Sequence, residues 1–227
     1  MSSAQHAPRV VEAYIGEYAS GKSEIAVNRA LELAGMGRRP VTLVDLDLVE
    51  PCYTLRPLKK SLEQAGITVL AWSTSELIGL GETGNMMQPA TRFCLLRSGD
   101  VIMDIGYGIS GAQALNLVEN AWTDPDLKIF AVINITRPMT ATVGQIVSHV
   151  RNLGRVEGLI NNTHLGDETD LAIVDQGVVA VDAAARILEI PVVATVVAEG
   201  LVPGIAEQDA RGHPVRVIRR LMPGAFW

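Results

Sequence analysis

The sequence predicts an α/β fold with a mostly parallel central sheet and helices on both of its faces. Short apolar segments alternate with helix-like segments along almost the whole chain, which is the order of a parallel sheet with right-handed crossovers. The strand-like segments are continuously apolar, as in strands buried on both faces. Hydrophobic residues make up 48% of the 227 residues and aromatic residues only 4%. Val, Ile, Leu and Ala must therefore build the core, which favours helices packed on a sheet over an aromatic-rich β-sandwich.

In the first half of the chain, apolar runs predict the strands, and apolar residues at helical spacing predict the helices. The clearest helix carries Ile25, Ala30 and Leu33 on one stripe and is closed by Gly35. Residues 72–89 mix polarities and contain several glycines, so no element is assigned to them. The predicted strands are 10–15, 41–46, 67–71 and 101–104, and the predicted helices are 24–34, 58–65, 90–96 and 111–121.

The same alternation continues through the second half of the chain. A long apolar-rich helix is expected to begin after Asp170 or Thr169, either of which can cap its first turn. No internal repeat, low-complexity tract or linker interrupts the pattern, so residues 1–227 are expected to form a single domain. The predicted strands are 128–134, 156–161 and 191–197, and the predicted helices are 141–152, 171–188 and a short terminal helix over 215–227.

The charge, the cysteine content and the lack of long apolar stretches indicate which partners and which cellular compartment to expect. With 25 acidic and 19 basic residues the formal net charge is −6, and no basic run offers a field for nonspecific nucleic-acid binding. No apolar stretch approaches the roughly 20 residues of a membrane span, and the N-terminus has no apolar core of a signal peptide. Cys52 and Cys94 form no CxxC pair. We expect a cytoplasmic protein without a nucleic-acid or membrane partner.

The strongest functional signal is the segment GEYASGKS, which runs from Gly16 to Ser23 and matches G-x-x-x-x-G-K-[ST]. Glycines allow the backbone to curl so that successive N–H groups point at phosphate oxygens. Lys22 supplies a charge for the β- and γ-phosphates, Ser23 can bind Mg²⁺, and the following helix points its positive dipole end at the anion. The expected nucleotide-binding residues of this loop are Gly16, Glu17, Tyr18, Ala19, Ser20, Gly21, Lys22, Ser23 and Glu24.

Carboxylates follow two further predicted strands. Asp45 and Asp47 end the strand VTLVDLD, and Asp104 ends VIMD. In a parallel sheet the carboxyl ends of the strands face one crevice, so these groups should lie at the edge that carries the phosphate loop. A carboxylate there can hold Mg²⁺ or orient the attacking water, although an acid at a strand end is also a common turn former. The predicted metal ligands are Ser23, Asp47 and Asp104, and the predicted catalytic residues are Lys22, Asp47 and Asp104.

These motifs together resemble the MinD/ParA/CobQ–CobB superfamily of P-loop NTPases. The carriers of the resemblance are GEYASGKSE, VDLDLVEP and VIMDIG. The resemblance implies that Asp47 assists hydrolysis and that Asp104 is the Walker B acid. It also implies that Asn162, with Asn161 as its neighbour, reads the adenine base. A closer resemblance is to a subgroup of bacterial ATPases with DLDxVxP and NNTHL motifs.

Two departures from the superfamily concern the loop and the cysteines. Many members carry a second lysine early in the loop that reaches the phosphates of a partner subunit, and Glu17 occupies that place here. A carboxylate cannot stabilise phosphate charge, so the loop is interpreted as an ordinary Walker A loop. The cysteine context of the members that bridge an iron–sulfur cluster is also missing, and a packed thiol is the interpretation for Cys52.

Several single residues carry weaker signals. Arg137 follows a predicted strand and could steady phosphate charge or contact a partner, although it could also be a solvated residue of a proline turn. Arg56 could respond to the γ-phosphate or be a solvated arginine. His164 and Glu168 are too few for a metal site and fit a helix entry.

The combined interpretation is a molecular switch that binds and hydrolyses Mg-ATP. It is expected to act on a protein partner or to form a homodimer, and metallocofactor maturation is one role that fits. ATP is favoured over GTP because Asn161–His164 does not match the N/T-K-x-D guanine motif. Two alternatives stay open. One is an ATP-dependent ligase or kinase of the CobB or dethiobiotin-synthetase kind, and the other is a nucleotide-binding module without useful turnover.

Overall fold

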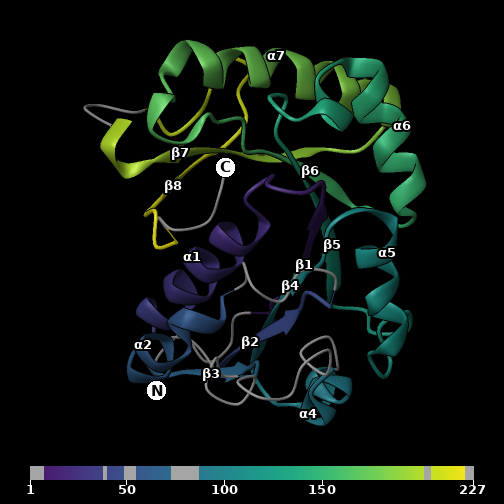
Figure 1. The fold of residues 1–227 in the computed structure, drawn as a ribbon, viewed down its shortest axis with the longest axis vertical. Coiled ribbons are helices and arrows are strands. Elements are labelled where there is room, and N and C mark those ends of the chain that lie inside the picture. Colours follow the sequence, from purple (N-terminus) through teal and green to yellow (C-terminus); the bar gives the residue numbers. More distant parts are fainter. Residues whose placement is uncertain (1–7, 38–39, 49–54, 73–86, 202–205, 223–227) are drawn as a thin grey trace, which may run out of the picture. The chain divides into compact units, whose positions relative to one another are not determined.

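The computed structural model describes residues 8–37, 40–48, 55–72, 87–201 and 206–222 (Figure 1). The chain divides into two units, the first formed by residues 1–14 and 25–128 and the second by residues 15–24 and 129–227. Each unit is described by itself. That residues 1–227 form a single nucleotide-binding domain stays a prediction.

The sheet of the first unit has the strand order β3-β2-β4-β1, and all of its pairings are parallel. Every residue of β1, β2 and β4 is buried. This pattern confirms the expectation of strands covered on both faces, because an open face would leave alternate residues exposed. The strands are β1 (Val11–Gly16), β2 (Val41–Leu46), β3 (Ile67–Leu70) and β4 (Asp100–Ile105).

Helix α1 (Lys22–Gly35) extends slightly beyond its predicted range of 24–34, whereas the other α-helices of the first unit are shorter than the sequence predicts. Two predicted helices, 90–96 and 111–121, are each replaced by one α-helical turn that continues as a 3₁₀ turn. The second of these ends early, because Val118 is extended and Asn120 has a φ of 65°, conformations that a helix cannot contain. The elements are α1 (Lys22–Gly35, whose first residues belong to the second unit), η3 (Arg56–Leu58), α2 (Lys59–Gln64), α4 (Pro89–Arg92), η5 (Cys94–Leu96), α5 (Gly108–Ala112) and η6 (Gln113–Leu117).

The second unit has the parallel strand order β5-β6-β7-β8. Helix α7 packs on β6, β7 and α6 (Figure 1). Asp170 caps α7 by accepting a hydrogen bond of 2.8 Å from the N–H of Ile173, which decides between the two predicted caps. The elements are β5 (Leu127–Ile133), η7 (Pro138–Thr140), α6 (Val143–Leu153), β6 (Gly158–Asn161), η8 (Gly166–Glu168), α7 (Leu171–Leu188), β7 (Val192–Ala198), η9 (Glu199–Leu201) and β8 (Val215–Ile218).

The predicted terminal helix over 215–227 is wrong in its described part. Residues Val215–Ile218 form β8 and pair with Thr195–Ala198 of β7 in parallel register. Three of these four residues are β-branched, and such residues lose side-chain freedom in a helix and suit a pleated surface. The free edge of β7 therefore outweighs the weak helical pattern. Residues 223–227 lie outside the described part of the chain.

Cys94 is buried as a free thiol, and burial raises its pKa to about 11, so it stays protonated at neutral pH. Cys52 falls outside the described residues, and so do residues 73–86 of the unassigned segment 72–89, whose last residue begins α4. Within the described ranges, no helix combines the length and the apolar character that crossing a membrane requires.

A close approach of α7 to β6 provides a test of this packing. A Cβ on Gly177 would lie 2.2 Å from Thr163 Oγ1 and 2.5 Å from Asn161 Oδ1, and both side chains are buried and bonded to each other. We expect Gly177→Ala to lower the free energy of unfolding by about 1–3 kcal/mol. The matched control is Gly144→Ala in α6, where nothing lies within 4 Å and alanine should stabilise the helix by up to about 1 kcal/mol. Urea unfolding measures both, and equal effects of the two substitutions would contradict the packing argument.

Candidate functional site

The loop between β1 and α1 has a backbone that glycine makes possible. Gly16 and Gly21 have φ values of 150° and 87°, which residues with a side chain rarely adopt. A Cβ on Gly16 would lie 2.5 Å from the carbonyl oxygen of Val132, and a Cβ on Gly21 would lie 2.2 Å from Asn162 Nδ2. Ala19 also has a positive φ of 54°, a conformation that costs a non-glycine residue about 1 kcal/mol or more. The loop therefore keeps a strained turn at the start of a helix, the geometry in which backbone N–H groups bind an anion.

Two polar side chains of the loop have lost most of their contact with solvent. Lys22 is 7% exposed, and its ammonium group donates a hydrogen bond of 2.9 Å to the carbonyl oxygen of Glu17. Ser20 is fully buried, and its Oγ has no hydrogen-bond partner among the described residues. Buried hydroxyls are almost always bonded, so the Ser20 hydroxyl fits a place where a polar ligand completes the site. Ser23 lies in the first turn of α1 and is half-buried.

Glu17, the acidic residue of the loop, contacts other residues of the second unit. The Glu17 carboxylate accepts a hydrogen bond of 2.8 Å from the N–H of Tyr18, and its second oxygen lies 3.9 Å from His149 Nδ1 of α6. His149 is almost completely buried. Burial lowers the pKa of His149, Glu17 opposes this shift, and Lys22 adds to it. His149 escaped the sequence interpretation, although its place beside Ile146 and Leu153 on the buried stripe of α6 could have marked it.

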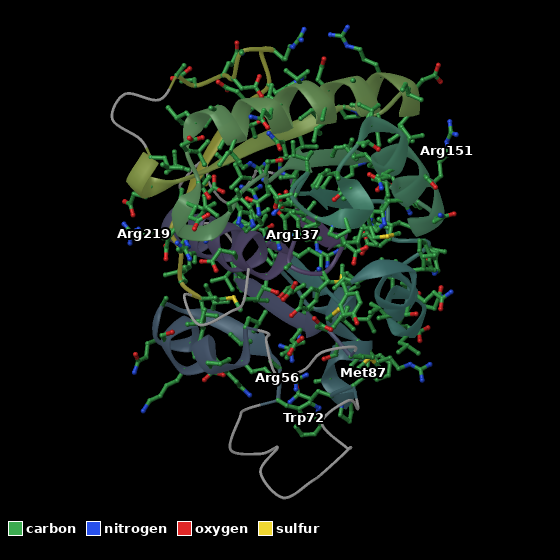
Figure 2. All side chains as sticks on the ribbon, turned by 45° about the horizontal axis from the view of Figure 1, so that its top comes forward. Arg56, Trp72, Met87, Arg137, Arg151 and Arg219 are labelled. Atoms are coloured by element: carbon green, nitrogen blue, oxygen red, sulfur yellow. The ribbon has the colours of Figure 1, made fainter. Side chains whose placement is uncertain are left out.

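Arg137 also belongs to the surroundings of the loop. Burial lowers its pKa, and the nearby Tyr18 opposes that shift. Its Nε is buried and has no hydrogen-bond partner among the described residues. In Figure 2 the labelled Arg151 and Arg219 point away from the ribbon, and the Arg219 side chain is 72% exposed, whereas Arg137 is half-buried. The Nε atom of Arg137 is therefore not solvated, in contrast to the alternative interpretation of a solvated arginine.

The two asparagines after β6 have different environments. Asn162 Nδ2 donates a hydrogen bond of 2.7 Å to the carbonyl oxygen of Ser20, which joins the end of β6 to the phosphate loop. Asn161 is fully buried, and its amide bonds to Thr163 and to Thr195. Asn161 therefore holds the β6–β7 edge together, and of the pair only Asn162 also lines a cavity.

That cavity opens beside the loop, entirely within the second unit, and its volume is about 470 Å³ with its open mouth included. Burial lowers the pKa of His164 in its wall to about 4, so the imidazole is neutral at neutral pH. The lining combines apolar residues of β7 and β8 with polar residues of α1 and of the segment between β6 and α7. The main lining residues are Gly21, Glu24, Asn162, His164, Val196, Val197, Ile218 and Arg220.

Glu24 connects this cavity to the C-terminal segment. Its carboxylate accepts hydrogen bonds from the N–H groups of Leu221 and Met222. Burial raises the pKa of Glu24 above its usual value. These two bonds and the charge of Arg220 oppose that shift without cancelling it. Arg220 also pairs with Asp167. The chain beyond β8 is thus fastened to the first turn of α1.

The predicted catalytic carboxylates lie in the first unit. Asp104 is fully buried on β4, and Asp45 of β2 is its registered neighbour. Asp47 is half-buried just beyond the end of β2. Arg56 is buried, and its Nε lies 2.7 Å from Asp45 Oδ2, so the solvated interpretation of Arg56 is wrong. Burial raises the pKa of Asp45, and the Arg56 guanidinium opposes this shift.

No protein-family model matches this sequence, and no curated protein does either. Solved structures do match. The chain resembles the cell division protein FtsY of Thermotoga maritima with a TM-score of 0.56 and 20% identity over 84% of this chain. It resembles the signal recognition particle receptor FtsY of Elizabethkingia anophelis with a TM-score of 0.56 and 15% identity over 83% of this chain. The 54 kDa protein of the signal recognition particle of Aeropyrum pernix, in complex with GDP, has a TM-score of 0.51 and 19% identity over 81% of this chain.

These likenesses confirm the predicted fold class, an α/β fold of the P-loop NTPase type. The chain spans 62%, 58% and 40% of the three matched chains. At these identities the likeness concerns the fold alone. The superfamily subgroup inferred from the sequence motifs stays a prediction.

The buried imidazole of His164 predicts a pH dependence of stability. Its pKa is about 4 in the fold and about 6.5 when unperturbed, so between these pH values the unfolded chain binds more protons. Stability therefore rises with pH across this window, and acidification from pH 6.5 to pH 4 should remove up to about 3 kcal/mol. His164→Gln lacks this proton site and should show a smaller loss in urea unfolding between pH 4 and pH 7. Parallel pH profiles of the variant and the wild type would refute this assignment.

Proposed function

We propose that the chain binds Mg-ATP and hydrolyses it as a molecular switch. The observation that carries this proposal is the loop from Gly16 to Ser23, with its positive-φ turns and Lys22, beside a cavity of about 470 Å³ in the same unit. A loop of this kind suits phosphates, and a mostly apolar cavity with a few polar groups suits a base. The buried, unpartnered Ser20 hydroxyl among the described residues supports a polar ligand at the loop.

In this proposal the loop binds the triphosphate through its backbone N–H groups, Lys22 and the positive end of α1. Lys22 exchanges its bond to the carbonyl oxygen of Glu17 for phosphate oxygens. Ser23 would hold Mg²⁺ directly, and Asp104 and Asp47 would hold it directly or through water. The metal ion would neutralise charge on the phosphates. Asp47, outside the strand and half-buried, is the carboxylate proposed to orient the attacking water.

The base is proposed to be adenine and to occupy the cavity. One N–H of Asn162 Nδ2 donates to the carbonyl oxygen of Ser20 and so fixes the side-chain amide, and we propose that its amide oxygen faces the base. An acceptor suits the N6 amino group of adenine, whereas guanine presents the acceptor O6 at that position. GDP is present in the matched Aeropyrum structure, so guanine is the competitor to test.

A switch passes its nucleotide state to another molecule, and we propose a protein partner or a second copy of this chain for that role. The alternation of bound ATP and ADP would change the loops around Asp47 and the residues after Asp104. Size-exclusion chromatography with each nucleotide distinguishes a nucleotide-dependent homodimer from a monomer that needs a different partner.

Replacement of the loop lysine tests nucleotide binding. Lys22→Ala removes the charge-assisted bonds to phosphate, each worth about 1.5–3 kcal/mol, so the affinity for ATP should fall about 10- to 100-fold. Titration calorimetry with Mg-ATP measures this change. The matched control is Lys60→Ala on the exposed side of α2, which makes the same charge change and should bind as the wild type does. An unchanged Kd for Lys22→Ala would overturn the phosphate-loop assignment.

Competition between nucleotides tests the base. ATP should displace a bound fluorescent ATP analogue at concentrations at least about fivefold lower than GTP requires, since a lost base-specific hydrogen bond is worth about 1 kcal/mol or more. Asn162→Asp keeps an acceptor but removes the N–H donor to Ser20, so it should weaken both nucleotides together. Displacement by GTP at equal or lower concentration would show that the cavity prefers guanine.

A further inference from the structure

A buried ion pair lies at the carboxyl end of β2. Arg56 Nε is 2.7 Å from Asp45 Oδ2, and the two side chains are only 4% and 1% exposed. Removing two charges from water is costly, and a buried pair often adds little to stability compared with apolar residues of the same size. The pair is therefore better explained by the geometry that it imposes than by stabilisation alone.

That geometry concerns Asp47, which lies one residue beyond the strand. Asp45 Oδ1 accepts a hydrogen bond of 3.0 Å from the N–H of Asp47. The Arg56 guanidinium reaches the carbonyl oxygen of Asp47 at 3.5 Å. Both backbone polar groups of Asp47 are thus bonded to the same ion pair, at a position where the β2 ladder no longer supplies partners.

The pair also lies next to the other predicted catalytic carboxylate. Asp45 is registered opposite Asp104 in the parallel β2–β4 ladder. Registered neighbours of a sheet project from the same face, so Asp45 and Asp104 share one face. An element fixed at Asp45 is consequently fixed relative to Asp104, within the same unit.

We propose that Asp45 and Arg56 are positioning residues that hold the backbone of Asp47 and so direct its carboxylate toward the reacting water. This inference rests on the proposed role of Asp47 in hydrolysis. Neither residue contacts nucleotide in this arrangement. Their loss should therefore lower kcat and leave the binding of ATP nearly unchanged.

The test is Arg56→Lys, which keeps the charge but replaces a rigid fork by one flexible ammonium group. A single ammonium cannot reproduce the guanidinium geometry toward Asp45 and Asp47, and small misplacements of a catalytic group reduce rates strongly. We expect kcat to fall about tenfold or more while the Kd for Mg-ATP stays within about twofold. The matched control is Arg92→Lys on α4, an exposed arginine paired with Glu119, which should keep the wild-type kcat.

A double-substitution cycle separates positioning from general damage. Asp47→Asn should be slow by itself, and adding Arg56→Lys to it should cause little further loss, since the pair acts through Asp47. Amide hydrogen exchange supplies a readout without nucleotide, in which Arg56→Lys should speed exchange at Asp47. If Arg56→Lys does not fold, Asp45→Asn replaces it in the same cycle, because it breaks the same ion pair while keeping an acceptor for the N–H of Asp47.

The outcomes distinguish the positioning role of Asp45 and Arg56 from the proposed role of Asp47 in hydrolysis. Wild-type kcat in Arg56→Lys, or an equal further loss in the Asp47→Asn background, overturns the positioning role while Asp47 keeps its own. If Asp47→Asn hydrolyses ATP as fast as the wild type, the proposed function of Asp47 fails and the positioning role falls with it.

Discussion

The hydrogen bond from Asn162 Nδ2 to the carbonyl oxygen of Ser20 is the contact on which the second unit's site depends. The loop has positive φ values at Gly16, Ala19 and Gly21, so neither a strand ladder nor a helix supplies regular partners for its backbone. Asn162, 142 residues further along the chain, bonds to the loop where α1 is about to begin. The same side chain lines the cavity. The loop therefore meets the cavity both directly, through Gly21, and through Asn162, which would connect the proposed phosphate and base recognition.

The C-terminal segment also contributes to the lining of the cavity. Ile218 of β8 and Arg220 line it, and the next two residues bond through their N–H groups to the Glu24 carboxylate. Glu24 belongs to the first turn of α1, which also carries Ser23. The N-terminus of α1 thus connects two segments that line the cavity. The phosphate loop precedes it in the chain, and the segment after β8 bonds to its Glu24.

Sequence reasoning succeeded where local rules decide the structure and failed where distant contacts do. Continuous apolar runs located seven of the strands, and the loop motif predicted that a helix follows the loop, because strand burial and loop glycines depend on adjacent residues. The strand β8 could not be distinguished from a helix, since its conformation depends on the free edge of β7. The burial of Arg56 depends on its pairing with Asp45, eleven residues away. His149 was overlooked because only the tertiary fold brings α6 to Glu17.

The distribution of charge is compatible with the proposed anion site in an acidic chain. The net charge of −6 repels polyanions at long range, so attraction must be local. In the second unit, the Lys22 ammonium group is bonded to a backbone carbonyl oxygen, and the Arg137 guanidinium is partly buried, which lowers its pKa. Each of these groups is desolvated before any ligand arrives, and a desolvated cation interacts more strongly with phosphate than a hydrated one does. Glu17 keeps its carboxylate engaged with the N–H of Tyr18 and beside His149. The loop therefore tolerates an acidic residue because local bonds and burial, rather than net charge, determine the field at the phosphate position.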